Sequence, residues 1–152
     1  LRGFGEQAVV VAEAVSVTLL ATQVAKSAFG RQRPYAWAGT GPSEGQDDVL
    51  SLWSGHTAVA FAAATSAATA ARLRGHRAWR WILGAGLVGA TAVGWLRVAA
   101  DRHWATDVLA GAAVGSAAGL GLPVWLHGPA APPGGRSLSL LVLPNGVMGT
   151  FD

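Results

Sequence analysis

A histidine and a carboxylate with the spacing of a catalytic pair lie in the third quarter of the sequence. His103 and Asp107 are four residues apart, so they share one helix face if the chain is helical from Trp104 onward. A carboxylate in that position can hold one imidazole nitrogen and leave the other free as a nucleophile or base. Arg97, six residues before His103, could bind an anion beside it. The same pattern also fits a structural histidine at a helix end with interfacial charges.

Further residues suited to anion chemistry stand at the edges of other apolar segments. Lys26 ends the first apolar segment and Arg33 follows it, while Ser54, Gly55 and His56 directly precede the second. Backbone amides at a helix N-terminus, with a glycine beside them, form a ready anion site. Cations and such amides together suit a dianionic phosphoryl group. Two histidines could then act as nucleophile and proton donor.

Four apolar segments must position these residues, and we predict that each crosses a membrane as a helix: residues 7–25, 58–71, 81–96 and 108–126. Hydrophobic residues make up 51% of the chain and charged residues 12%, against about 25% charged in soluble domains. Seven tryptophans accompany a single tyrosine, which suits membrane interfaces. The sequence therefore predicts an all-α, membrane-embedded helical bundle.

Connectivity alone brings the polar residues to one side of the membrane. Consecutive spans alternate in direction, so the end of the first, the start of the second, the end of the third and the start of the fourth share one face. The opposite face receives a run of arginines, Arg72, Arg74, Arg77 and Arg80. The positive-inside rule makes that face cytoplasmic. We therefore predict a protein of the inner (cytoplasmic) membrane whose reactive face is periplasmic.

The segments outside the spans carry weaker signals. Residues 35–53 read as a polar, glycine-containing loop without a period, in which Asp47 and Asp48 are expected to be solvated. In the last span, Gly111, Gly115 and Gly119 recur every fourth residue, which favours close packing of helices.

The chain divides into a membrane domain, residues 1–127, and a tail, residues 128–152. The tail reads as a proline- and glycine-rich linker followed by a short strand at residues 137–143 and a hairpin turn at Asn145 and Gly146. The absence of cysteine excludes disulfides and thiolate zinc sites. No acidic or histidine cluster suggests a metal, so no cofactor is predicted. No basic run with interleaved aromatics suggests nucleic acid as a partner.

The motifs resemble the signature of the type 2 phosphatidic acid phosphatase (PAP2) superfamily, which includes class A acid phosphatases and vanadium haloperoxidases. That signature has three parts: K-x6-R-P, P-S-G-H and S-R-x5-H-x3-D. Residues 26–34 match the first part completely, and residues 53–56 match the second except that Trp53 replaces its proline. Residues 96–107 match the third except that Leu96 replaces its serine. The resemblance covers about residues 7–126, with the order and internal spacings kept throughout.

The resemblance implies a role for each matched residue. It makes His103 the nucleophile that forms a phosphohistidine, Asp107 the carboxylate that orients it, and His56 the general acid. The phosphate-binding set that it implies is Lys26, Arg33, Ser54, Gly55 and Arg97. The function implied is a metal-independent phosphatase that hydrolyses a phosphorylated lipid within the bilayer. Its candidate substrates are phosphatidic acid, phosphatidylglycerol phosphate and polyprenyl diphosphate.

Two other functions stay open at this point. The same anion pocket could hold vanadate in a haloperoxidase-like enzyme, or it could serve a non-catalytic membrane protein that binds anions or lipids. Membrane members of the family have six spans, so two N-terminal spans are expected to be absent from this chain. The sequence does not indicate an oligomeric state.

Overall fold

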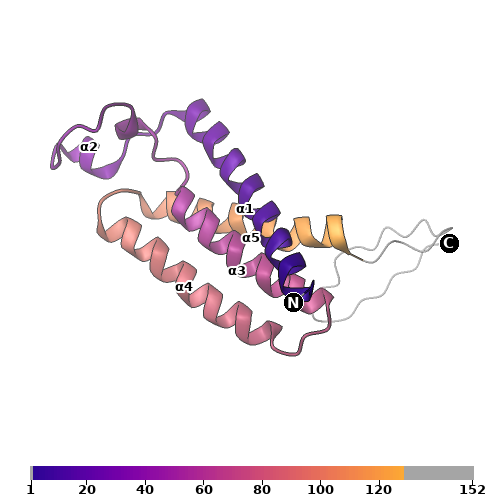
Figure 1. Cartoon of the computed structure of the whole chain (residues 1–152). Helices are drawn as coiled ribbons and strands as arrows, with labels where there is room; N and C mark the ends of the chain where they lie inside the picture. Colours follow the sequence, from indigo (N-terminus) through magenta and orange to yellow (C-terminus); the bar gives the residue numbers. More distant parts are fainter. Residues whose placement is uncertain (1, 129–152) are drawn as a thin grey trace, which may run out of the picture.

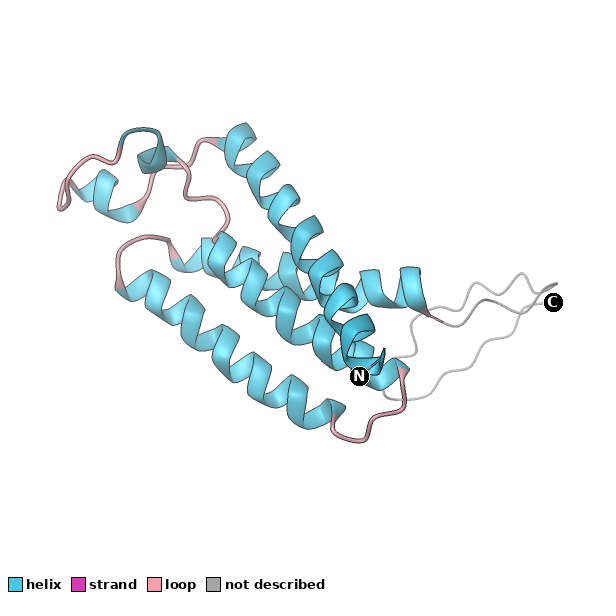
Figure 2. Ribbon diagram, viewed as in Figure 1, coloured by secondary structure: helices cyan, strands magenta, loops and turns pink. Residues whose placement is uncertain are grey.

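The computed structural model describes residues 2–128 as a bundle of four long helices with a small polar region at one end (Figures 1 and 2). The long helices are α1 (Arg2–Phe29), α3 (Gly55–Leu73), α4 (Trp79–Ala99) and α5 (Ala105–His127). A short helix, α2 (Pro34–Ala38), and a 3₁₀ helix, η1 (Gly45–Val49), lie between α1 and α3. The prediction of an all-α bundle is confirmed over residues 2–128. The strand and hairpin expected in the tail lie outside the described residues.

The four long helices contain the four predicted spans, but not all four are apolar enough to cross a membrane. Three segments are long and apolar enough to cross a membrane: Gly3–Ala38, Trp79–Ala99 and Ala105–His127. Helix α3 does not reach that hydropathy, because its sequence is built largely from alanine, threonine and serine. It packs against α1, α4 and α5, and its central place is visible in Figure 1. A helix enclosed by other helices needs less apolar surface than one that faces lipid.

Large apolar side chains cover much of the outside of this bundle. Trp81 is 83% exposed, Trp125 79%, Val88 73% and Leu109 68%. Such a surface is too apolar for a soluble monomer. Together with the three apolar segments, it identifies an integral membrane protein.

The glycines of α5 allow it to approach α3 closely. A Cβ at Gly115 would lie 2.1 Å from the carbonyl oxygen of Ala58, and one at Gly111 would lie 2.6 Å from that of Ser54. The prediction that these glycines serve close helix packing is confirmed. The contact also matters for the polar end, because Ser54 directly precedes α3.

We expect Gly115→Ala to destabilise the protein, because the backbone of α3 must move to admit the new methyl group. Overpacking of this kind costs about 1–3 kcal/mol. Gly121→Ala is the matched control, since Gly121 lies on the same helix and a Cβ there meets nothing within 4 Å. This control should be neutral or slightly stabilising, because alanine favours helix. Thermal unfolding of both variants in detergent measures the difference, and equal midpoints would contradict the packing argument.

The predicted loop at residues 35–53 is wrong in part, because it contains α2 and η1. Pro34 occupies the first turn of α2, where its fixed φ favours helix, and Gly39 ends the helix with a left-handed φ of 65°. The prediction that the polar residues between the spans gather at one end of the bundle is confirmed. Figure 1 shows the end of α1, this region, the start of α3 and the turn between α4 and α5 at the same end of the molecule.

Candidate active site

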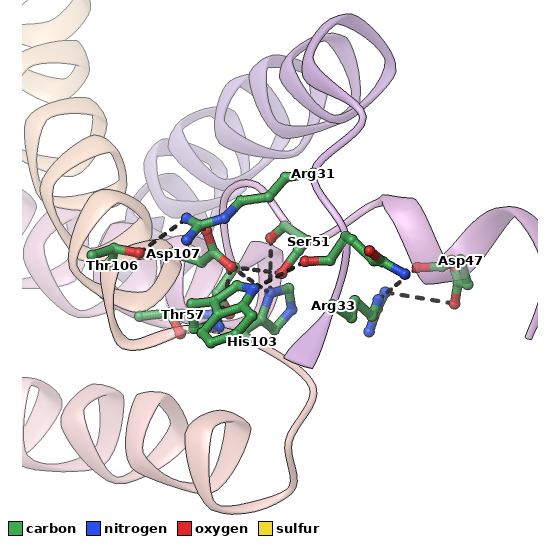
Figure 3. A network of polar contacts seen from close by, with 11 residues as sticks. Arg31, Arg33, Asp47, Ser51, Thr57, His103, Thr106 and Asp107 are labelled. Atoms are coloured by element: carbon green, nitrogen blue, oxygen red, sulfur yellow. Dashed lines mark hydrogen bonds and ion pairs between the residues drawn. The ribbon is translucent and has the colours of Figure 1, made fainter. Parts of the chain in front are cut away.

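His103 lies in the turn between α4 and α5 and is almost completely buried, with 2% of its surface exposed. Its Nδ1 lies 2.8 Å from the main-chain carbonyl oxygen of Ser51. The nearer carboxylate oxygen of Asp107 lies 3.9 Å from the same nitrogen, which is too far for a hydrogen bond. The imidazole is therefore held by a main-chain carbonyl from a different segment of the chain (Figure 3).

Asp107 is fully buried, and both of its carboxylate oxygens are engaged. Oδ2 accepts hydrogen bonds from the Ser51 hydroxyl at 2.6 Å and from the Trp104 backbone N–H at 3.1 Å. Oδ1 forms an ion pair with Arg31 at 2.5 Å, and Arg31 also donates to Thr106 at 2.9 Å. Figure 3 shows Arg31 reaching this carboxylate from the segment after α1. Asp107 thus ties three parts of the chain together.

The surroundings of His103 keep its ring neutral. Burial lowers the pKa of His103 to about 3, and the positive charges of Arg33, Arg97 and Lys26 also lower it, whereas the hydrogen bond to Ser51 opposes them. Because a carbonyl oxygen only accepts, the proton of the neutral ring sits on Nδ1. Nε2 then carries a free lone pair, which is the form that a nucleophile needs.

Arg33 is held in place by the polar region after α2. The residue is 5% exposed, and its Nε donates to the carbonyl oxygen of Asp47 at 2.7 Å. The Asp47 carboxylate lies 3.6 Å from Arg33 Nη2, and the carbonyl of Asp48 accepts the Arg33 backbone N–H. The expectation of solvation holds for the Asp47 side chain, which is 56% exposed, but not for Asp48, whose carboxylate accepts hydrogen bonds from Tyr35 and Ser43. The main-chain carbonyls of both aspartates hold Arg33. They position a residue of the predicted phosphate-binding set.

A second contact joins this region to the turn that carries His103. Arg102 forms an ion pair with Glu44 and stacks over the ring of Tyr35 at 5.2 Å. The Tyr35 hydroxyl donates to the Asp48 carboxylate at 2.7 Å, and its backbone N–H donates to the carbonyl of Asp101. The α2–η1 region and the α4–α5 turn are therefore connected directly beside His103.

The start of α3 contributes the second predicted motif. Ser54 is the N-cap, and its hydroxyl accepts hydrogen bonds from the backbone N–H and the hydroxyl of Thr57. Its own N–H donates to the carbonyl of Asp107 at 3.0 Å. Trp53, which replaces the proline of the family signature, donates from its indole to Thr22 of α1 at 2.8 Å. The substituted residue thus anchors the start of α3 to α1.

His56 and the remaining cations complete the cluster. Burial lowers the pKa of His56, and so do the positive charges of Arg97, Lys26 and Arg33. These are the same three cations that act on His103, so both histidines lie in one positive field. Within residues 2–128, Arg97 Nε is buried and has no hydrogen-bond partner. A buried donor without a partner is costly, and this one belongs to Arg97 of the predicted phosphate-binding set.

The structure brings together most of what the sequence singled out, and it adds residues that the sequence did not. Leu96, which replaces the serine of the third motif, is 63% exposed. Ser51 and Arg31 were not predicted, because neither shows a periodic or spacing signal. Arg102 pairs with Glu44, which is 58 residues away in the sequence.

Comparison with known proteins places this geometry in a family. The model of the PAP2 superfamily matches residues 7–129, which contain all three motifs. The chain belongs to the PAP2 superfamily. The recognition made from the motifs is therefore confirmed.

The chain is also similar to one individual protein with a named activity. This PAP2 chain is 36% identical over 124 residues to a lipid A 1-phosphatase of Porphyromonas gingivalis. The match covers 76% of this chain and 25% of that protein, so the chain spans about a quarter of its relative's length. No solved structure shows a significant match.

Proposed function

We propose that this chain is a metal-independent phosphatase that hydrolyses a phosphorylated lipid through a phosphohistidine intermediate. The observation that carries the proposal is the pair of histidines under one set of three cations. His103 is buried, neutral and oriented through Nδ1, while His56 is exposed at the start of α3. Membership of the PAP2 superfamily and the likeness to a lipid A 1-phosphatase support this reading.

In the proposed first step, Nε2 of His103 attacks phosphorus, and the bond to the leaving oxygen breaks as His56 protonates that oxygen. His56 carries this proton once the phosphoryl dianion is bound, because the dianion offsets the three cations that lower the pKa of His56. In the second step His56 takes a proton from water, and the hydroxide attacks phosphorus and releases His103. Lys26, Arg33 and Arg97, with the backbone amides at the start of α3, bind the phosphoryl oxygens. They stabilise the negative charge there in the transition state. Asp107 positions His103, and Ser54 and Gly55 shape the start of α3.

The cations supply the positive charge that a metal ion provides in other phosphatases. We therefore expect phosphate release in detergent to continue unchanged in excess chelator. A metal-dependent alkaline phosphatase assayed in the same buffer is the control and should lose its activity. Inhibition by the chelator that added Mg²⁺ reverses would contradict the proposal.

The substrate class follows from the place of the cluster at the end of an apolar bundle, where a lipid can keep its tails in the bilayer. Phosphatidic acid, phosphatidylglycerol phosphate and a polyprenyl diphosphate are the candidates, and the relative adds a glycolipid phosphate, lipid A 1-phosphate. Initial rates on these four substrates at equal surface concentration rank them. We place the site on the periplasmic face of the inner membrane, because the turn with Arg74 and Arg77 lies at the opposite end.

A further inference from the structure

The contact that orients the proposed nucleophile differs from a direct histidine–aspartate pair. His103 Nδ1 meets the Ser51 carbonyl at 2.8 Å, whereas Asp107 Oδ2 lies 3.9 Å away. The Ser51 hydroxyl in turn donates to Asp107 at 2.6 Å. Ser51 therefore stands between the two, with its main chain toward the imidazole and its side chain toward the carboxylate.

We propose that Ser51 is the residue that orients His103, and that Asp107 acts on His103 through Ser51 rather than by direct contact. Ser51 has no exposed surface, and its backbone N–H donates to the Arg31 carbonyl at 2.9 Å. The N–H and the hydroxyl of Ser51 are thus each held by one hydrogen bond, and its carbonyl is left to accept from His103. This inference rests on the proposed function, in which His103 is the nucleophile.

The surroundings of Asp107 agree with this indirect role. Its Oδ2 accepts hydrogen bonds from the Ser51 hydroxyl and the Trp104 N–H, and its Oδ1 forms an ion pair with Arg31. A carboxylate engaged by three donors serves to hold chain segments in place. The Nδ1–H tautomer of His103 depends instead on the Ser51 carbonyl. A carbonyl oxygen can only accept a hydrogen bond, so the ring proton must be on Nδ1.

Substitutions at Asp107 separate the indirect role from a direct one. An asparagine side chain can place its oxygen where Oδ2 lies and still accept from Ser51 and Trp104. Asp107→Asn keeps these two bonds and loses the ion pair with Arg31, and it should lower kcat by no more than about 10-fold. Asp107→Ala also releases Ser51 and should lower kcat by about 10- to 100-fold. In a direct pair, asparagine favours the wrong tautomer and costs about 10⁴-fold.

Ser51→Ala tests the serine itself. It should lower kcat by about 10- to 100-fold, the range seen when the groups that orient a metal-ligating histidine are removed. KM should stay unchanged, because the phosphate-binding cations are untouched. Adding Asp107→Ala to Ser51→Ala should cost less than the product of the two single losses, because both substitutions remove the hydrogen bond from Ser51 to Asp107. Asp107→Ala additionally removes the bonds from Trp104 and Arg31. The proposal would be overturned by an unchanged kcat in Ser51→Ala, or by a double variant whose loss in kcat equals the product of the two single losses.

A spectroscopic measurement tests the same point without relying on turnover. In protein labelled with ¹⁵N-histidine, the His103 ring signals are assigned by their disappearance in His103→Gln. They should report the Nδ1–H tautomer in the parent protein and still in Asp107→Asn. An Nε2–H tautomer in Asp107→Asn would refute the relay through Ser51. If the parent protein releases no phosphate, the proposed function fails, while the tautomer still decides how His103 is held.

Discussion

Replacing His103 with alanine is expected to abolish phosphate release, with a loss of at least about 10³-fold in kcat. The reason is that His103 is the buried imidazole of the described cluster, and its Nε2 lone pair is free because Nδ1 is bonded to the Ser51 carbonyl. Burial and the neighbouring cations hold the pKa of His103 near 3, so its lone pair is available across the whole neutral range. The rate of chelator-resistant release from phosphatidic acid in detergent measures the loss.

The control for this substitution is His76→Ala. His76 is exposed in the turn between α3 and α4, at the opposite end of the bundle, so its removal should leave the rate unchanged. Because His103 is buried, both variants must first elute as the parent does on gel filtration and show equal helix content. Acid-labile phosphate on the protein, trapped by a rapid quench with ³²P-labelled substrate, should appear in the parent and be missing in His103→Ala. A folded His103→Ala that keeps more than about a tenth of the parent rate would exclude this histidine as the nucleophile.

Replacing His56 with alanine is expected to slow the hydrolysis of a lipid phosphate by about 10²- to 10⁴-fold, as for loss of a general acid. An alkoxide leaves poorly without a proton, so the first step depends on His56. With p-nitrophenyl phosphate the leaving group departs without protonation, and the first step should be nearly unaffected. The ratio of the two losses is the informative quantity, and stopped-flow measurement of nitrophenol gives the second of them.

The second proposed step makes the His56 experiment sharper. Since His56 also activates the water, His56→Ala should accumulate phosphohistidine and release nitrophenol in a burst that matches the amount of enzyme. His56 is exposed, so the substitution should not disturb the fold. Equal losses on both substrates without a burst would mean that His56 binds the substrate and transfers no proton. His76→Ala again serves as the control.

The α2–η1 region illustrates where sequence reasoning stops. Its residues show no helical or alternating period, so the sequence predicted a loop with solvated aspartates. Their actual partners are decided by the path of the chain: Asp47 contacts Arg33, and Glu44 pairs with Arg102 of another turn. A charged side chain at the surface can find several partners, and only the packed fold selects one.

The substituted motif positions show the same limit. In the sequence, Trp53 departs from the family signature by replacing its proline. In the fold its indole bonds to Thr22 of α1, a contact across 31 residues that no spacing rule indicates. Leu96, the other position that departs from the signature, is largely exposed.

The sequence by itself determined the helical bundle, the glycine contacts of α5, the family, and the gathering of three motifs at one end. These follow from local periodicity and from the alternating direction of consecutive helices, which need no knowledge of side-chain contacts. Only the tertiary structure decided that α3 is the enclosed helix and that His103 is held by Ser51, 52 residues away. It also decided that Arg31 neutralises Asp107, 76 residues away. Hydrogen bonds and ion pairs depend on positions within a few tenths of an ångström, and in this molecule the loops that join the helices set those positions.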